Sequence, residues 1–283
     1  TRARQLYEYA TDPGQYYEMH YAALYNYFLD QGNDAPTAYS KAVSTLTSNE
    51  IGGLGYNVYE VPSGQNLIGT NGKLNPDAKL GRKYTNINKV TKEEKEFYLT
   101  PDDWLDELYD PSFRQEYNIS VAGATEKSNF FASFGYLDNT GITDGSDMER
   151  YTARVRADYQ AKKWLKVGVN MNYTKFNWNG ASSSNEGDGS TGDVFSAVAN
   201  MAPIYPVFVR DGEGNIMKDE HGWPIYDSGD GSVNGMMRSS GSQSNPLQNI
   251  WLDESNSEGN AFGVNGFADF IFMPGLKLTI NGA

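Results

Sequence analysis

Cysteine is absent from this chain of 283 residues, and histidine occurs only twice, as His20 and His221. Without cysteine the chain has no disulfide framework, no thiolate nucleophile and no cysteine metal site. Neither histidine has a serine or cysteine arranged around it in the sequence, so a hydrolase triad has little support. We therefore expect structural roles for both histidines and no bound metal or cofactor.

Long apolar runs are also missing. No stretch approaches eighteen consecutive apolar residues, so the sequence predicts no transmembrane helix. This leaves a membrane barrel open, because only alternate residues of a barrel strand face lipid. The N-terminal residues 1–4 lack the apolar core of a secretion signal. Because the chain opens and closes abruptly, we expect it to be a piece of a longer protein.

Basic residues are outnumbered by acidic ones. The chain carries 23 lysines and arginines against 36 aspartates and glutamates, a net charge of −13. Binding to nucleic acid requires a basic footprint on the protein. The charge therefore argues against nucleic acid as a partner and indicates a solvated acidic surface.

The main positive signal is alternation of apolar and polar residues between Glu116 and Trp178. Between 148 and 160 the odd positions 151, 153, 155, 157 and 159 carry apolar side chains, and arginine, threonine and aspartate fall between them. A period of two places the two sets on opposite faces of a strand. The same pattern occurs over 165–174 and, less cleanly, over 117–121 and 130–136. Two more strands are predicted over 262–272 and 276–280, joined at Pro274-Gly275.

The predicted connections alternate in length. Those at 124–127, 161–164 and 274–275 are short, whereas 138–147 and 179–258 are long and polar, as in outer-membrane barrels. Tyr151 and Tyr159 lie on one face about 26 Å apart along the strand. With a tilt of about 40° this gives roughly 20 Å along the membrane normal, close to the height of the apolar band. A soluble antiparallel sheet gives the same alternation, so the pattern alone leaves both interpretations open.

Four motifs follow one another within this region. They are S-x-x-G-x-T-x-K, S-x-G-Y-x-x-x-x-G, E-R-Y-x-x-R and W-L-K-x-G-x-N. Their residues here are Ser120, Gly123, Thr125, Lys127, Ser133, Gly135, Tyr136, Gly141, Glu149, Arg150, Tyr151, Arg154, Trp164, Leu165, Lys166, Gly168 and Asn170. This region closely resembles the early barrel strands of SusC/RagA-type TonB-dependent outer-membrane transporters. One departure is Ala124, which stands where the family usually has a second glycine.

The resemblance implies a fold and a function. The fold is mainly β: part of a large antiparallel transmembrane β-barrel of about 22 strands, with a helical N-terminal excursion and long extracellular loops. The function is TonB-dependent import of oligosaccharides or peptides across the cell outer membrane, together with a SusD-like surface lipoprotein. TonB would act through a plug region that is not visible in this sequence. Such a transporter is not an enzyme. The alternative from another class is a soluble or cell-surface β-rich glycan-binding module.

From the sequence and the resemblance we expect four regions. They are a helical and irregular region at 1–115, four barrel strands at 116–178, a long extracellular loop with a small hairpin at 179–258, and two further strands at 259–283. Asp12-Pro13 predicts a helix start, with a helix ending near Gly32. A second helix is expected over 36–49 and a solvated helical turn over 91–98. Thr100, Trp104 and Asp106 resemble a segment that precedes the first strand in the family.

Two acidic regions call for a chemical interpretation. Asp102, Asp103, Asp106 and Glu107 share one short segment at a predicted helix start. Glycosidases hold two carboxylates apart across a cleft, so helix capping is the expected role here. The segments 143–147 and 211–215 look superficially like calcium loops, but both lack the full ligand series of an EF-hand. We interpret them as turns.

Binding residues are expected on the loops and on the inner face of the strands. The substrate-contact candidates are Trp178, Tyr205, Trp223 and Tyr226, because sugars stack on aromatic rings and loops carry binding groups. Burial within the folded loop is the alternative for each of them. The lumen-lining candidates are Arg150, Arg154, Arg156, Asp158, Asn170 and Asn172. Arginine facing lipid costs about 2–4 kcal/mol at the membrane midplane, which favours the lumen for these positions.

Overall fold

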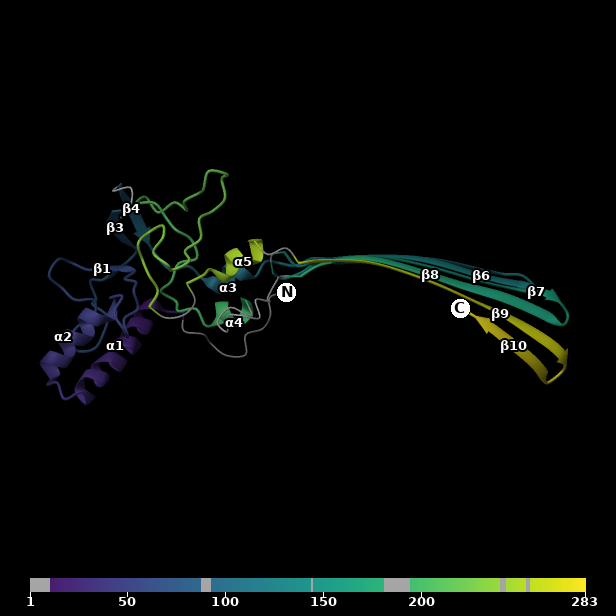
Figure 1. The fold of residues 1–283 in the computed structure, drawn as a ribbon, viewed down its shortest axis with the longest axis horizontal. Helices are drawn as coiled ribbons and strands as arrows, with labels where there is room; N and C mark the ends of the chain where they lie inside the picture. The colour runs from purple at the N-terminus through teal and green to yellow at the C-terminus, as the bar shows by residue number, and fades with distance from the viewer. Residues whose placement is uncertain (1–10, 88–92, 144, 181–193, 240–242, 253–254) are drawn as a thin grey trace. The chain divides into compact units, whose positions relative to one another are not determined.

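The computed structural model describes residues 11–87, 93–143, 145–180, 194–239, 243–252 and 255–283. The chain divides into two compact units (Figure 1). The strand unit comprises Asp110–Ser182 and Asp253–Ala283, and the loop unit comprises Ala3–Tyr109 and Ser183–Leu252. Within the described ranges, no helix is both long enough and apolar enough to cross a membrane.

The strand unit is one antiparallel sheet of six strands, which curve together along their length (Figure 1). Each strand pairs with its neighbours in chain order, so the spatial order is β10-β9-β8-β7-β6-β5. The strands are β5 (Arg114–Ala124), β6 (Ser128–Thr140), β7 (Asp147–Lys162), β8 (Leu165–Asn179), β9 (Asn256–Met273) and β10 (Leu276–Gly282). The predicted strands and their antiparallel order are confirmed.

The short turns lie where the sequence predicts them. Between β5 and β6 the Thr125 N–H donates to the Ser128 carbonyl at 2.7 Å. Between β9 and β10 the turn residue Gly275 has φ +88°, a left-handed conformation that glycine adopts without strain. The strand β9 begins at Asn256, earlier than predicted, and Asn256 pairs with Asn179. Its first residues are polar and glycine-rich, so their strand conformation depends on pairing with β8 rather than on intrinsic propensity.

The described part of the loop unit combines five helices, two small two-stranded antiparallel sheets and irregular segments. Helix α1 begins where predicted, because Asp12 accepts hydrogen bonds from the N–H groups of Gly14 and Gln15 at 2.7 and 3.1 Å and proline follows it. Its elements are α1 (Pro13–Asp30), α2 (Ala35–Leu46), β1 (Tyr59–Glu60), β2 (Lys79–Leu80), β3 (Arg82–Ile87), β4 (Glu94–Leu99), α3 (Trp104–Leu108), α4 (Val194–Ala199) and α5 (Pro246–Leu252).

The core of the loop unit is rich in tyrosine. Tyr17, Tyr21 and Leu24 are the buried stripe of α1, and they pack with residues from α2 and from the segments 54–59 and 202–205. The Tyr17 hydroxyl donates to the Tyr56 carbonyl at 2.7 Å, which satisfies its polar end inside the core. Residues on both sides of the strand unit in sequence therefore share this core.

The prediction of a helical turn over 91–98 is wrong. Residues Glu94–Leu99 form β4, which pairs antiparallel with β3 from Arg82↔Leu99 to Ile87↔Glu94. The charges that suggested a solvated helix lie on the exposed part of this strand, while Phe97 and Leu99 are buried in the unit. Tertiary burial of these two side chains outweighs the weak local preference of the charged run. The second helix also ends earlier than expected, at Leu46.

Replacing Gly55 with alanine is expected to destabilise the loop unit. Gly55 has φ +74°, and a Cβ there would overlap the Met237 carbonyl oxygen. The left-handed conformation alone costs an alanine about 1–2 kcal/mol, and the overlap adds to this cost. Gly64 is the matched control, since it has φ +81° and open space around it. Proteolysis of the full-length protein should accelerate clearly for Gly55→Ala and only slightly for Gly64→Ala; equal rates would contradict the overlap.

Candidate functional site

One face of the strand unit is apolar and exposed. This face continues across five neighbouring strands, because apolar residues pair with one another from strand to strand. One such row is Ile119, Phe134, Ala153, Tyr173 and Phe262. The side chain of Ile119 is 73% exposed and that of Phe262 is 70% exposed. A soluble monomer rarely exposes such a continuous apolar surface, which therefore marks contact with a membrane or another protein.

Aromatic side chains lie at both ends of this apolar face. Toward the long connections, the hydroxyls of Tyr136 and Tyr151 donate to Glu149 Oε1 at 2.9 and 3.2 Å, and the two rings lie 5.0 Å apart. At the short-turn end, Trp164 stacks on Phe270 with ring centroids 6.3 Å apart. Amphipathic rings of this kind suit a boundary between an apolar layer and water.

The opposite face of the same strands is polar. By register it carries the six residues predicted to line a lumen: Arg150, Arg154, Arg156, Asp158, Asn170 and Asn172. Near the short turns, Asp158 is 8% exposed and accepts hydrogen bonds from Asn129 at 2.9 Å and from Lys166 at 2.8 Å. The structure thus brings the six together on one face, opposite Val155. Their lumen-lining role stays a prediction.

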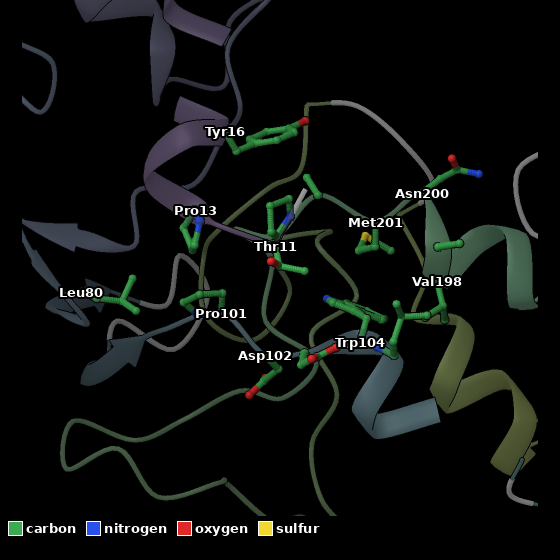
Figure 2. A pocket seen from close by; sticks show the side chains of 15 residues that line it. Thr11, Pro13, Tyr16, Leu80, Pro101, Asp102, Trp104, Val198, Asn200 and Met201 are labelled. Carbon is green, nitrogen blue, oxygen red and sulfur yellow. Dashed lines mark hydrogen bonds between the residues drawn. The ribbon is translucent and has the colours of Figure 1, made fainter. Parts of the chain in front are cut away.

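The loop unit contains a cavity of about 420 Å³ between the start of α1, the segment around α3 and the chain after α4. Thr11, Trp104 and Met201 lie close together around it (Figure 2). The Trp104 indole N–H donates to the Tyr205 carbonyl at 2.8 Å, which fixes the ring that lines the cavity. Among the described residues that line this cavity there is neither lysine nor arginine. It therefore suits an uncharged, partly apolar group better than an anion.

The acidic segment beside this cavity has two separate roles. Asp103 caps α3 as expected, accepting from the N–H groups of Leu105 and Asp106. Asp102 does not act as a cap, contrary to the prediction. It forms a two-point ion pair with Arg210, at 2.5 and 3.0 Å, and also accepts from the Val207 N–H. Its partner lies far away in sequence, so the local pattern could not reveal this role. Among the described residues, no three acidic or histidine side chains gather as metal ligands.

No family model matches the chain. Over 169 residues, 59% of the chain, it is 28% identical to TonB-dependent receptor P26 of Formosa agariphila, and it covers 14% of that protein. Over 182 residues, 62% of the chain, it is 25% identical to TonB-dependent receptor SusC of Bacteroides thetaiotaomicron, and it covers 17% of that protein. Over more than half of its length the chain is thus similar to TonB-dependent receptors, SusC among them.

A solved structure of the RagAB peptide transporter also aligns with this chain. The match has a TM-score of 0.47 and 24% identity, and it covers 63% of this chain and 18% of the other. The chain spans less than a fifth of the length of the curated SusC-type receptors, at 14% and 17%. Those relatives are named as receptors, not as enzymes.

The four aromatic residues predicted to contact substrate are not brought together. Trp178 lies on β8 in the strand unit, and the other three lie in the loop unit. Tyr205 is only 3% exposed, and its hydroxyl donates to the Leu54 carbonyl, so it belongs to the core. Tyr226 is half-buried against Phe208. Trp223 remains exposed and pairs with a tryptophan that sequence reasoning missed.

That missed residue is Trp251, on α5. Its ring centroid lies 5.7 Å from that of Trp223, edge to face, and the two side chains are 57% and 55% exposed. The loop around Trp223 is held by a turn in which Asp219 accepts from the His221 and Trp223 N–H groups, both at 2.9 Å. The pair is an exposed aromatic surface on the loop unit. The pair is recognised only in the structure, where α5 lies close to this turn.

The loop unit is also organised around a buried carboxylate, Asp227. Its side chain accepts hydrogen bonds from Tyr56 at 2.8 Å, from the Gly229 N–H at 2.7 Å and from Asn234 at 2.8 Å. The Arg238 guanidinium lies 3.8 Å from it. Burial raises the pKa of Asp227, and these donors and the arginine oppose that rise. The sequence offered no signal for this network.

Proposed function

We propose that this chain forms part of the barrel wall and extracellular loops of a transporter that imports cargo across the outer membrane with energy supplied through TonB. The strand unit would be the wall, with its apolar face toward lipid and its polar face toward the lumen. The loop unit would lie outside the cell. No covalent chemistry is required, because capture and release of cargo complete the task.

One observation carries this proposal: the exposed apolar face that runs from β5 to β10. The side chains of Ile119, Phe134, Tyr173, Phe262 and Ile280 are all at least 39% exposed. An antiparallel sheet in a soluble protein turns its apolar face to a core. In the described part of this chain, the apolar face of the sheet has no second layer of its own unit against it. Lipid is the medium that such a face fits.

The partner and cargo are also part of the proposal. A SusD-like surface lipoprotein would cover the extracellular side, and the cargo would be an oligosaccharide or a peptide. The name of the curated relative SusC supports a SusD-like partner. The exposed pair Trp223 and Trp251 supports an oligosaccharide cargo, because it offers rings on which a sugar could stack. A soluble or cell-surface glycan-binding module is the second candidate, favoured by the same pair.

Purification of the native full-length protein tests the proposal. We expect it in the outer-membrane fraction, dependent on detergent, as a band whose mobility changes on heating, together with a stoichiometric lipoprotein identified by mass spectrometry. Recovery of a folded, monodisperse protein from the soluble fraction would contradict import and favour the glycan-binding module. Recovery from the membrane without a lipoprotein would keep the barrel and remove the partner.

A further inference from the structure

Three arginines form a row on the polar face of β7. Arg150, Arg154 and Arg156 all lie at even positions, opposite Tyr151 and Val155. Along a strand, Arg154 and Arg156 are about 7 Å apart, and the whole row spans about 20 Å. We refer to these three residues as the arginine row. It is a concentration of positive charge in a chain whose net charge is −13.

The arginine row has little neutralising charge within the described residues. Arg154 donates through Nε to Asn170 Oδ1 at 3.2 Å, a neutral partner. Arg150 and Arg156 make no hydrogen bond or ion pair with any other described residue. The Nε of Arg150 is buried without a partner. A buried donor without a partner is costly, so an acceptor is expected to approach Arg150 from outside the sheet. Arg154 and Arg156 are exposed, and their charges are accessible to a ligand.

The carboxylates nearest to the row on the same face are already engaged. Asp158 is bound by Lys166 at 2.8 Å and by Asn129 at 2.9 Å. Glu116 is bound by Arg114 at 2.7 Å. On β8, the residues that pair with Arg154 and Arg156 are neutral: they are Asn172 and Asn170, respectively. Apart from a longer-range attraction between Arg156 and Asp158, the sheet therefore leaves the guanidinium charges to be matched by another molecule.

A concavity adjoins Arg154 and Arg156 of the arginine row. It has a volume of about 550 Å³ and is lined by Phe131, Arg154, Arg156, Asp158 and Lys166, among others. This volume is within the range of small-ligand sites, about 300–1,000 Å³. Guanidinium groups bind carboxylates through two parallel hydrogen bonds, which gives both affinity and orientation. The Phe131 ring adds an apolar contact beside the charges.

We propose that the arginine row is an anion-binding wall that selects carboxylate-bearing oligomers as cargo. The proposal rests on the proposed function, because it takes this face to line the lumen. The spacing of about 7 Å between Arg154 and Arg156 matches side chains two positions apart in an extended peptide. An acidic peptide and an oligouronate share this chemistry. An acidic segment of the same transporter packed permanently on the row is the competing occupant.

The test measures binding of three cargo probes to the full-length transporter in detergent: an acidic hexapeptide with alternating glutamates, its glutamine analogue and a uronate hexasaccharide. We expect the acidic peptide or the uronate to bind at least about tenfold more tightly than the glutamine analogue at low salt. In Arg154→Gln/Arg156→Gln this preference should disappear, because a hydrogen bond to a charged group contributes about tenfold or more per site. The preferred acidic probe identifies the source of the carboxylates.

Two matched variants keep the result interpretable. Lys163→Gln removes one positive charge from the exposed β7–β8 turn and should leave the preference unchanged. Arg154→Lys/Arg156→Lys keeps the charge without the planar fork, and it should retain part of the preference. A glutamine variant that binds all three probes as the parent does would overturn the proposal.

An acidic segment of the transporter bound permanently to the arginine row would give a different result. If the glutamine variant lowers the unfolding temperature of the cargo-free transporter while the acidic preference persists, the row pairs with a segment of the transporter and the proposal is wrong. A transporter that inserts and binds the neutral probe but shows no acidic preference also overturns it, yet leaves import standing. Failure of the parent protein to insert in a membrane removes the proposed function itself.

Discussion

Val155→Arg is expected to reduce strongly the insertion of the full-length protein into the outer membrane, where the proposed function places this strand. Val155 lies near the middle of β7 on the apolar face, between Ala132 on β6 and Met171 on β8. An arginine facing lipid at the midplane costs about 2–4 kcal/mol. This corresponds to a loss of about tenfold or more in the folded fraction. The fraction of heat-modifiable receptor in isolated outer membranes measures it.

The matched control places the same new side chain on the other face of the same strand. Thr152 pairs with Gly135 and Thr174, all on the polar face. We expect Thr152→Arg to reach the membrane at a level close to that of the parent, because its charge would meet water. If both variants insert equally well, the assignment of one face to lipid and the other to the lumen is wrong. If neither inserts, the strand does not tolerate arginine on either face, and the assignment loses its support.

Asp227→Ala is expected to have the second large effect, a loss of about 3–5 kcal/mol in the stability of the loop unit. The substitution leaves Tyr56, Asn234 and the Gly229 N–H without their acceptor, and it leaves a buried arginine, Arg238, without its nearest carboxylate. Removing one member of a buried charged pair has a cost of this size. Hydrogen exchange of the full-length receptor should show faster exchange in 205–239 and 54–59, while the strands keep their protection.

Asp211→Ala is the comparison for that experiment. Asp211 also accepts hydrogen bonds from backbone N–H groups, those of Glu213 and Asn215 at 3.0 Å, but it lies on an exposed turn. Water replaces an exposed partner, so the expected loss is about 1 kcal/mol or less. Exchange in 205–239 should then stay close to that of the parent. Similar exchange in both variants would mean that the Asp227 network is not what holds this region.

The sequence could predict what depends on neighbours along the chain. The alternation in β7 places Val155 and Arg156 on opposite faces, and Asp12 with Pro13 marks the start of α1. These features come from backbone geometry and capping, which act over a few residues. The turn at 211–215 belongs to the same class, since Asp211 accepts from the N–H of Asn215 within one turn.

What could not be predicted depends on contacts between distant segments. The ion pair of Asp102 with Arg210 joins positions 108 residues apart, and the hydrogen bond of Tyr56 to Asp227 joins positions 171 apart. Tyr205 is buried because Leu54 and Tyr56 cover it, although its own surroundings in sequence suggest a loop. The strand β4 forms because β3 offers a partner. These contacts depend on tertiary packing, which local propensity does not encode.

The division of the chain into units constrains the order in which the protein can mature. The loop unit is assembled from residues before β5 and residues after β8, since Tyr56 needs Asp227 and Leu54 needs Tyr205. During synthesis its first half must wait until β5 to β8 have been made. Those four strands pair only with sequence neighbours and can close as local hairpins, whereas β9 joins β8 across the long segment between Asn179 and Asn256. Contacts close in sequence form faster than distant ones. Until the second half of its unit has been made, the tyrosine-rich stripe of α1 therefore lacks part of the core that buries it.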